Sequence, residues 1–264
     1  MKLLLSLALL SLVTACSHTN KVKNSKNSYS PKISFAENEK TYEANVQLPK
    51  VFNDKLPLIV IVHEWWGRTP YVMGRSEMLN KEGYATLVVD LYGSGKTVET
   101  PAEAQAMATP FYQNPETSIK LLTKYVEMAK KDPHVDASKV YVIGYCFGGT
   151  QALNFARSGA DIKGVVSFHG GLATTVPAQG LKADVLALNG LADSFVPAKE
   201  RAAFEKEMKK FKARYKVVNY KDAKHAFTNP NSTEVGKKYN MPIAYNQKAD
   251  EASWKELMAF LKKK

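Results

Sequence analysis

The chain has 264 residues, with 37 Lys and Arg against 25 Asp and Glu, a formal net charge of +12, and two cysteines. Its length and its 45% hydrophobic residues suffice for a full-sized core, so a disordered polymer is excluded and one large domain is favoured. Two cysteines exclude a disulfide-stapled scaffold and a cysteine-rich zinc or iron–sulfur site. Whether the positive charge indicates a nucleic-acid partner depends on where the lysines lie.

The first 15 residues are typical of a bacterial lipoprotein signal peptide. Lys2 precedes the apolar run 3–13, which is too short for a transmembrane helix because such a helix needs about 20 apolar residues. The run ends in Val13-Thr14-Ala15-Cys16, which resembles the lipobox, whose cysteine is lipidated. We therefore expect residues 1–15 to be removed and lipid on Cys16 to hold the protein at the membrane. An ordinary secretory signal is the alternative.

Residues 16–40 are predicted to be a flexible tether, because residues 17–30 are mostly Ser, Asn and Lys, with little to bury. The lysines are spread over this tether, the C-terminal tail 262–264 and the polar face of a helical stretch at 206–212. No aromatic-interleaved basic stripe or DNA- or RNA-binding motif occurs, so no nucleic-acid partner is expected. The predicted location is the bacterial cell envelope, on the periplasmic side or at the outer membrane. In known lipoprotein sorting signals, which this segment resembles, an aspartate after the cysteine retains the protein at the inner membrane. This chain has Ser17 at that position, which favours the outer membrane.

From residue 41 onward, short β-branched apolar runs alternate with helical patterns. In chain order, strands are expected at residues 42–48, 58–62, 85–90, 140–143, 164–168, 185–188 and 215–220. Helices are expected at 72–82, 102–112, 116–131, 148–157, 198–211 and 247–263, while 228–246 has the length of a functional loop. This alternation predicts a single α/β domain over residues 41–264, a mostly parallel sheet with helices on both faces. Ligands of such sheets bind at the carboxyl ends of the strands.

A candidate nucleophile follows the fourth expected strand. The segment Gly144-Tyr145-Cys146-Phe147-Gly148-Gly149 leads directly into a helical pattern, and its small residues permit a tight strand-to-helix turn. At the start of a helix, the dipole and free N–H groups favour a thiolate on Cys146. A buried structural cysteine beside packing glycines is the alternative.

A candidate acid and base follow in the order that such enzymes use. Asp193 lies 47 residues after Cys146 and follows one strand, and His225 lies 32 residues after Asp193 and follows the next. Together they predict a Cys-His-Asp triad, with Asp222 as a nearby carboxylate outside it. The other histidines show no metal-ligand spacing, so neither a metal nor a cofactor is expected.

These motifs resemble those of the dienelactone hydrolase family of α/β-hydrolases. The resemblance extends from about residue 42 to the C-terminus and is carried by His63-Glu64-Trp65-Trp66-Gly67, Asp90-Leu91-Tyr92-Gly93, the cysteine turn, Asp193-Ser194-Phe195-Val196-Pro197 and His225-Ala226-Phe227. It implies that Glu64 contacts the cysteine and helps to switch it to the thiolate. It also implies an oxyanion hole from the backbone N–H groups of Phe147 and Trp65.

The resemblance implies the chemistry without fixing the substrate. Where founding members of the family bind a substrate carboxylate with arginines, this chain has Gly93-Ser94-Gly95 and Asn229. Trp65, Trp66, Phe147 and Tyr92 are expected to line an apolar pocket for a small ester.

The leading hypothesis is a lipid-anchored hydrolase that cleaves a carboxylic ester or lactone through a cysteinyl thioester. A non-catalytic envelope-anchored binding lipoprotein and a thiol redox sensor at Cys146 remain the alternatives.

Overall fold

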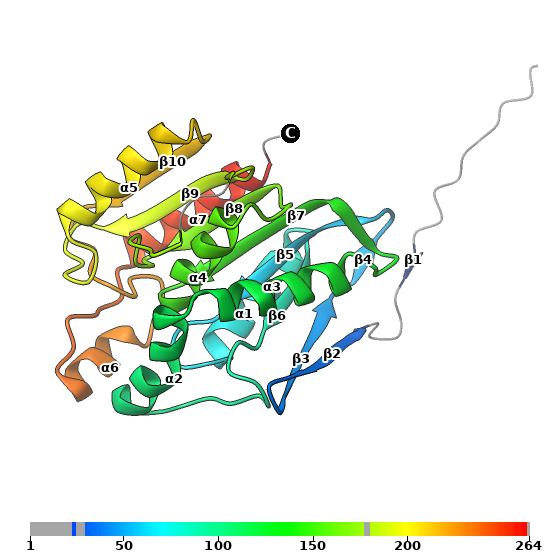
Figure 1. Ribbon diagram of the computed structural model, residues 1–264, viewed down its shortest axis with the longest axis horizontal. Helices are drawn as coiled ribbons and strands as arrows, with labels where there is room; N and C mark the ends of the chain where they lie inside the picture. Colours follow the sequence, from blue (N-terminus) through cyan, green and yellow to red (C-terminus); the bar gives the residue numbers. More distant parts are fainter. Residues whose placement is uncertain (1–22, 25–29, 177–179, 263–264) are drawn as a thin grey trace, which may run out of the picture.

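The computed structural model describes residues 23–24, 30–176 and 180–262, and its centre is one eight-stranded sheet (Figure 1). The strands lie in the order β10-β9-β8-β7-β5-β6-β3-β2. Their bounds are β2 Lys32–Glu37, β3 Lys40–Gln47, β5 Leu56–Val62, β6 Ala85–Val89, β7 Val135–Tyr145, β8 Gly164–Phe168, β9 Asp184–Gly190 and β10 Tyr215–Tyr220. Pairing is parallel from β10 through β6, and β3 and β2 add to one edge in antiparallel orientation. The predicted fold class is confirmed.

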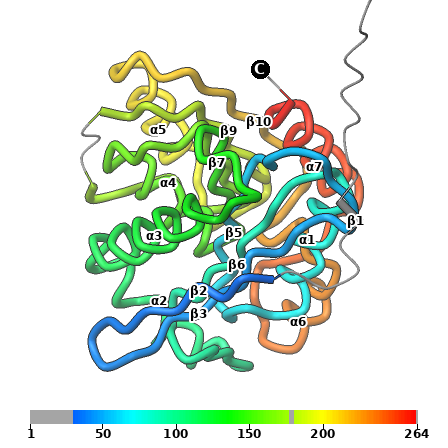
Figure 2. The backbone as a smooth tube through the Cα atoms, turned by 90° about the vertical axis from the view of Figure 1, so that its right-hand side faces the viewer, coloured from blue at the N-terminus to red at the C-terminus, as the bar shows by residue number. Residues whose placement is uncertain are grey.

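Helices cover both faces of the sheet (Figure 2). They are α1 Pro70–Lys81, α2 Pro101–Gln113, α3 Glu116–Ala129, α4 Phe147–Arg157, α5 Ala198–Lys210, α6 Ser232–Tyr239 and α7 Gln247–Leu261. Strand β5, buried at every residue except Pro57, shows why two layers form, because its successive side chains point to opposite faces. Leu58 and Val60 join a core cluster with α3, α4 and α5, whereas Ile59 and Ile61 join one with α1 and α7.

The ordered domain begins earlier than the sequence pattern predicted. Strand β2 pairs with β3 along its whole length, from Lys32 opposite Asn45 to Glu37 opposite Lys40. The two residues between these strands, Asn38 and Glu39, have φ of 47° and 61°, the left-handed conformation of a tight hairpin. The predicted tether 16–40 therefore extends too far. Ile33 alternates with polar neighbours and is buried, which is the signal that the Ser/Asn/Lys composition upstream obscured.

Two further elements depart from the predicted outline. The short strands β1 Lys23–Asn24 and β4 Val51–Phe52 pair with each other outside the main sheet. The stretch 228–246, predicted as a loop, contains α6, whose eight residues are followed by Asn240 in the left-handed conformation. Such a short helix carries too few turns to show a clear apolar period.

The predicted signal peptide 1–15 and the predicted lipidation site Cys16 lie outside the described residues. Among the residues that are described, none of the helices combines the length and apolar character that crossing a membrane requires.

Candidate active site

The candidate catalytic residues meet at the carboxyl edge of the parallel strands. Neighbouring strands end in register there, with Val62 of β5 opposite Gly144 of β7 and Tyr145 opposite Phe168 of β8. Since β9 and β10 end at the same edge, the loops after all five strands converge on one place. The structure thereby brings together residues that are up to 161 positions apart, from Glu64 to His225.

Cys146 stands on a sharp turn between β7 and α4. Its φ of 54° and ψ of −119° are unusual for a residue with a side chain, and such conformations cost about 1–3 kcal/mol. The turn needs glycine on both sides because the backbones approach closely. A Cβ on Gly144 would lie 2.0 Å from the carbonyl oxygen of Gly148, and one on Gly148 would lie 2.3 Å from that of Val62. The predicted strand–turn–helix setting of the cysteine is present.

The three predicted triad members form a continuous chain of contacts. His225 Nε2 lies 3.0 Å from Cys146 Sγ, and His225 Nδ1 lies 2.9 Å from Asp193 Oδ2. The second carboxylate oxygen of Asp193 accepts the backbone N–H of Phe195 at 2.8 Å, which fixes the carboxylate. The Asp193 side chain is fully buried and that of His225 is 12% exposed. Asp193, rather than Asp222, therefore orients the imidazole.

The charges around His225 favour its protonated form. Burial alone would lower the pKa of His225, but negative charge on the neighbouring Cys146 sulfur and the contact with Asp193 together raise it from 6.5 to about 10. The surroundings of the ring therefore favour an imidazolium beside the sulfur. In general, a neighbouring imidazolium favours the thiolate form of a cysteine, which is the nucleophilic form.

Glu64 is buried beside the triad. It is 2% exposed, and its Oε2 accepts a hydrogen bond of 2.8 Å from Nδ2 of Asn229, which is also buried. Burial raises the pKa of Glu64 from 4.5 to about 7, against the opposing effects of the Asn229 hydrogen bond and of His225. The resemblance predicts that Glu64 contacts the cysteine. The two residues line the same pocket, where the Cys146 sulfur is hydrogen-bonded to His225 and the Glu64 carboxyl group to Asn229.

Two backbone N–H groups were predicted to bind an oxyanion. Phe147 is the first residue of α4, so its N–H has no intrahelical acceptor and lies next to the sulfur. Trp65 follows β5 on a turn in which the Gly67 N–H donates to the Glu64 carbonyl at 3.1 Å. The Trp65 carbonyl accepts the Tyr92 hydroxyl at 2.8 Å, which restrains the loop. Trp65 lines the same pocket as Cys146, and Phe147 follows Cys146 at the start of α4, so the predicted oxyanion hole is compatible with the positions of both residues.

A pocket of about 370 Å³ opens above the cysteine. Its wall is formed by residues from loops at the carboxyl edge and from the helices beside them: Glu64, Trp65, Trp66, Gln105, Tyr112, Cys146, Thr150, Gly171, Ala173, Phe195, Glu200, His225, Ala226, Met241 and Ile243. Tyr112 and Phe195 are 45% and 50% exposed. Their exposure at the pocket suits a ligand that covers them. A larger open groove of about 880 Å³ runs along α5, and its described lining includes no triad member.

The observed lining of the pocket differs from the prediction at two residues. Trp65 and Trp66 do line it, with ring centroids 5.0 Å apart. Tyr92 and the side chain of Phe147 are instead fully buried behind it, with ring centroids 5.7 Å apart. Their apolar surface is used to pack the turn against the core, so they support the wall without touching its contents.

The sequence matches the model of the dienelactone hydrolase family over residues 42–264. The chain belongs to the dienelactone hydrolase family. This places it in the α/β-hydrolase superfamily and makes it a hydrolase.

Individual relatives in sequence are distant. The chain is 27% identical to protein usf of Aquifex pyrophilus over 212 residues, 78% of this chain and 87% of that protein. It is 25% identical over 185 residues to a protein of Aquifex aeolicus that is provisionally named carboxymethylenebutenolidase, with 68% of this chain and 80% of that protein covered.

Solved structures show the same fold. A structure named m3DLH superposes with a TM-score of 0.81 at 25% identity, covering 88% of this chain and 96% of the other. The dienelactone hydrolase-like promiscuous phosphotriesterase P91, from metagenomic libraries, gives a TM-score of 0.79 at 23% identity, with the same coverage.

In this dienelactone hydrolase family member, a buried histidine supports the nucleophile turn. His169 follows β8 directly, and its Nδ1 accepts the backbone N–H of Cys146 at 3.2 Å, shared with the Phe168 carbonyl at 3.0 Å. Burial and the charge of His225 lower the pKa of His169 well below its ordinary value, so the ring is neutral and one nitrogen can accept. The sequence interpretation assigned His169 no role at the site, although its position after a strand end gave the same signal as the triad residues.

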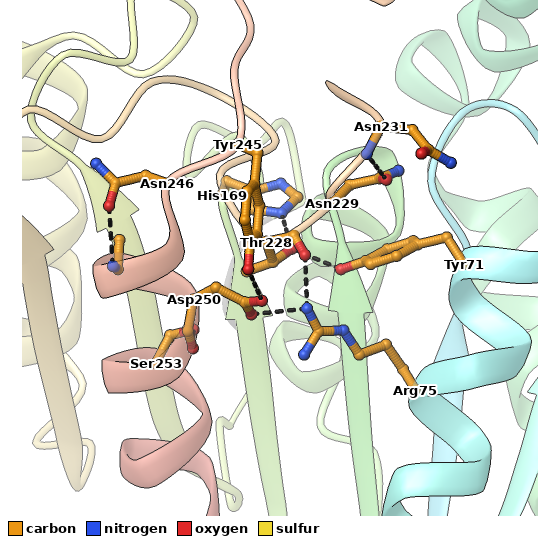
Figure 3. Close-up of polar contacts among 11 residues, drawn as sticks. Tyr71, Arg75, His169, Thr228, Asn229, Asn231, Tyr245, Asn246, Asp250 and Ser253 are labelled. Carbon is orange, nitrogen blue, oxygen red and sulfur yellow. Dashed lines mark hydrogen bonds and ion pairs between the residues drawn. The ribbon is translucent and has the colours of Figure 1, made fainter. Parts of the chain in front are cut away.

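His169 is the end of a buried polar network (Figure 3). Its Nε2 lies 2.7 Å from the Thr228 hydroxyl, which also contacts the Tyr71 hydroxyl at 2.6 Å. Arg75 donates to the Thr228 carbonyl and, at 2.6 Å, to Asp250 Oδ1. The network links α1, α7, the loop of His225 and the turn of Cys146. It therefore restrains the relative positions of base and nucleophile.

A metal site needs several ligand side chains that lie close together. In the described part of the chain, no group of three or more His, Cys, Asp or Glu side chains could hold a metal ion.

Proposed function

We propose that this protein hydrolyses a carboxylic ester or lactone through a thioester on Cys146. The observation that carries the proposal is the chain of contacts from Cys146 Sγ through His225 to Asp193, at 3.0 and 2.9 Å, at the floor of a pocket. The provisional name of the Aquifex aeolicus relative, carboxymethylenebutenolidase, supports a lactone or ester as the scissile group.

The chemistry divides into two steps. The Cys146 sulfur attacks the carbonyl carbon, and the resulting oxyanion is stabilised by the N–H groups of Phe147 and Trp65. Collapse of this intermediate forms the thioester and expels an alkoxide, which takes the proton from His225 Nε2. His225 then removes a proton from water, which attacks the thioester and releases the acid and the thiolate. Asp193 stabilises the imidazolium in both steps.

The test uses short p-nitrophenyl esters with the variants Cys146→Ala and His225→Ala. Both are expected to lose activity by about 10³-fold or more, because each removes a member of the triad. Asp222→Asn is the matched control, since this carboxylate lies on the loop of His225 outside the triad, and it should retain activity. Activity that survives in Cys146→Ala would contradict the proposal.

Thiol labelling separates the proposal from the two alternatives. Iodoacetamide should label Cys146 rapidly in the wild type and slowly in His225→Ala, because the histidine holds the thiolate. A binding lipoprotein would show neither fast labelling nor turnover. A redox sensor would give sulfenic acid under mild peroxide without esterase activity.

We also propose that the protein is exported and anchored in the bacterial cell envelope by lipid on Cys16. The support is the sequence of residues 1–16 alone. Metabolic labelling with a fatty-acid analogue should modify the wild type and not Cys16→Ala. A mature N-terminus other than residue 16 would refute lipidation at this site.

A further inference from the structure

The pocket above Cys146 carries carboxylates besides its aromatic walls. Glu64 and Glu200 both line it, and no lysine or arginine contributes to its wall among the residues described. The thiolate and the imidazolium of the catalytic pair offset each other in charge, whereas Asp193, behind His225, adds a further negative charge.

Glu200 is held in place. Its Oε1 accepts the backbone N–H groups of Leu172 and Ala173, the latter at 2.9 Å, so the carboxylate joins the start of α5 to the loop after β8. A side chain with two backbone donors on one oxygen cannot leave the pocket without breaking both bonds. Its charge is a fixed feature of the wall.

Two arginines that follow the Glu64 loop in the sequence are engaged outside the pocket. Arg75 is buried in the ion pair with Asp250, at 2.6 Å. Arg68 lies 4.0 Å from Asp90. Neither belongs to the pocket wall, so a negatively charged ligand would meet Glu64 and Glu200 without a compensating guanidinium.

One buried hydroxyl of the pocket wall is available to a ligand. The Thr150 hydroxyl is buried at the pocket and has no hydrogen-bond partner in the described residues. It can donate to a neutral carbonyl or ether oxygen. Trp65, Trp66, Tyr112 and Phe195 supply apolar surface around it.

We propose that the pocket accepts esters and lactones that carry no negative charge and rejects those that bear a carboxylate. This inference rests on the proposed ester hydrolysis and names its substrate class. In a pocket of this size, repulsion between like charges at low dielectric corresponds to a loss of about tenfold or more in kcat/KM.

The experiment compares mono-p-nitrophenyl adipate with its methyl ester at pH 8. The two share the leaving group and the acyl chain, and their far ends are a carboxylate in the first and an uncharged methyl ester in the second. The neutral ester should have a kcat/KM at least about tenfold higher. Gln105→Arg, which places a cation at the pocket wall, should narrow this ratio, whereas the matched uncharged variant Gln105→Met should not.

The outcomes separate this inference from the proposed function. Equal kcat/KM for the two esters, or preference for the anion, would overturn the inference and leave ester hydrolysis standing. Turnover of neither ester would refute the proposed function and this inference with it. A ratio that Gln105→Met narrows as much as Gln105→Arg does would also overturn the inference, because the effect would then come from shape.

Discussion

Replacing Glu64 by glutamine tests whether burial of its carboxyl group makes the stability of the protein depend on pH. In the folded protein its pKa is raised from 4.5 to about 7, chiefly by burial. Between these two values the folded chain retains a proton that the unfolded chain has lost. Because the unfolded state binds fewer protons, the free energy of unfolding falls as the pH rises through this window.

The magnitude follows from the width of the window. Each pH unit between the two pKa values is worth about 1.4 kcal/mol, so the full effect is about 3 kcal/mol between pH 4 and pH 8. Glutamine cannot titrate, and its side-chain oxygen can still accept the hydrogen bond from Asn229. Glu64→Gln should therefore gain stability relative to the wild type as the pH rises, by about 3 kcal/mol across this range.

Urea unfolding of both proteins at pH 4 and pH 8 measures this difference. Titrating groups that do not interact with Glu64 affect the wild type and the variant alike, so they cancel in the comparison. Glu234→Gln, at a side chain that is 76% exposed, is the control and should follow the wild type. If Glu64→Gln showed the same pH dependence as the wild type, the argument that burial governs this carboxyl group would be refuted.

Three further predictions concern the neighbouring residues. Cys146→Ala should lower the pKa of His225 from about 10, because negative charge on the sulfur is the main influence raising it; imidazole NMR titration would show an unchanged value if that attribution is wrong. Thr228→Val should cost about 1–3 kcal/mol in unfolding free energy, because the hydroxyl has two buried partners, and Thr228→Ser should restore most of it. Gly148→Ala should cost about 3 kcal/mol by overpacking against Val62, and an unchanged Tm would refute this.

The order of strands and helices could be predicted from the sequence, because buried apolar residues recur with the period of the strand or helix that carries them. Strands β8 and β10 have the predicted bounds. For the other five expected strands, the observed carboxyl end lies within three residues of the predicted one. At β7, the strand begins at Val135, five residues before the apolar run, because its first part pairs with β5 across a register shift. The residues that precede the apolar run in β7 are mostly polar, so the sequence shows no apolar periodicity that would mark them as part of the strand.

The site residues could be predicted where the mechanism requires particular residue types in a particular order along the chain. Cys146, Asp193 and His225 could be chosen because each follows a strand end, and all three meet. The sequence does not show which partner a buried polar side chain selects. Glu64 bonds to Asn229, 165 residues away, and His169 accepts the N–H of Cys146.

The sequence alone determined the layered sheet, the place of the nucleophile and the order of the triad, since these depend on residue type, local period and spacing. Only the tertiary structure decided the environment of those groups. Tyr92 became a support behind the pocket, Glu200 became part of its wall, and Thr228 became the junction between the His225 loop and the turn of Cys146. These outcomes depend on burial and on contacts between distant segments, which no local pattern encodes.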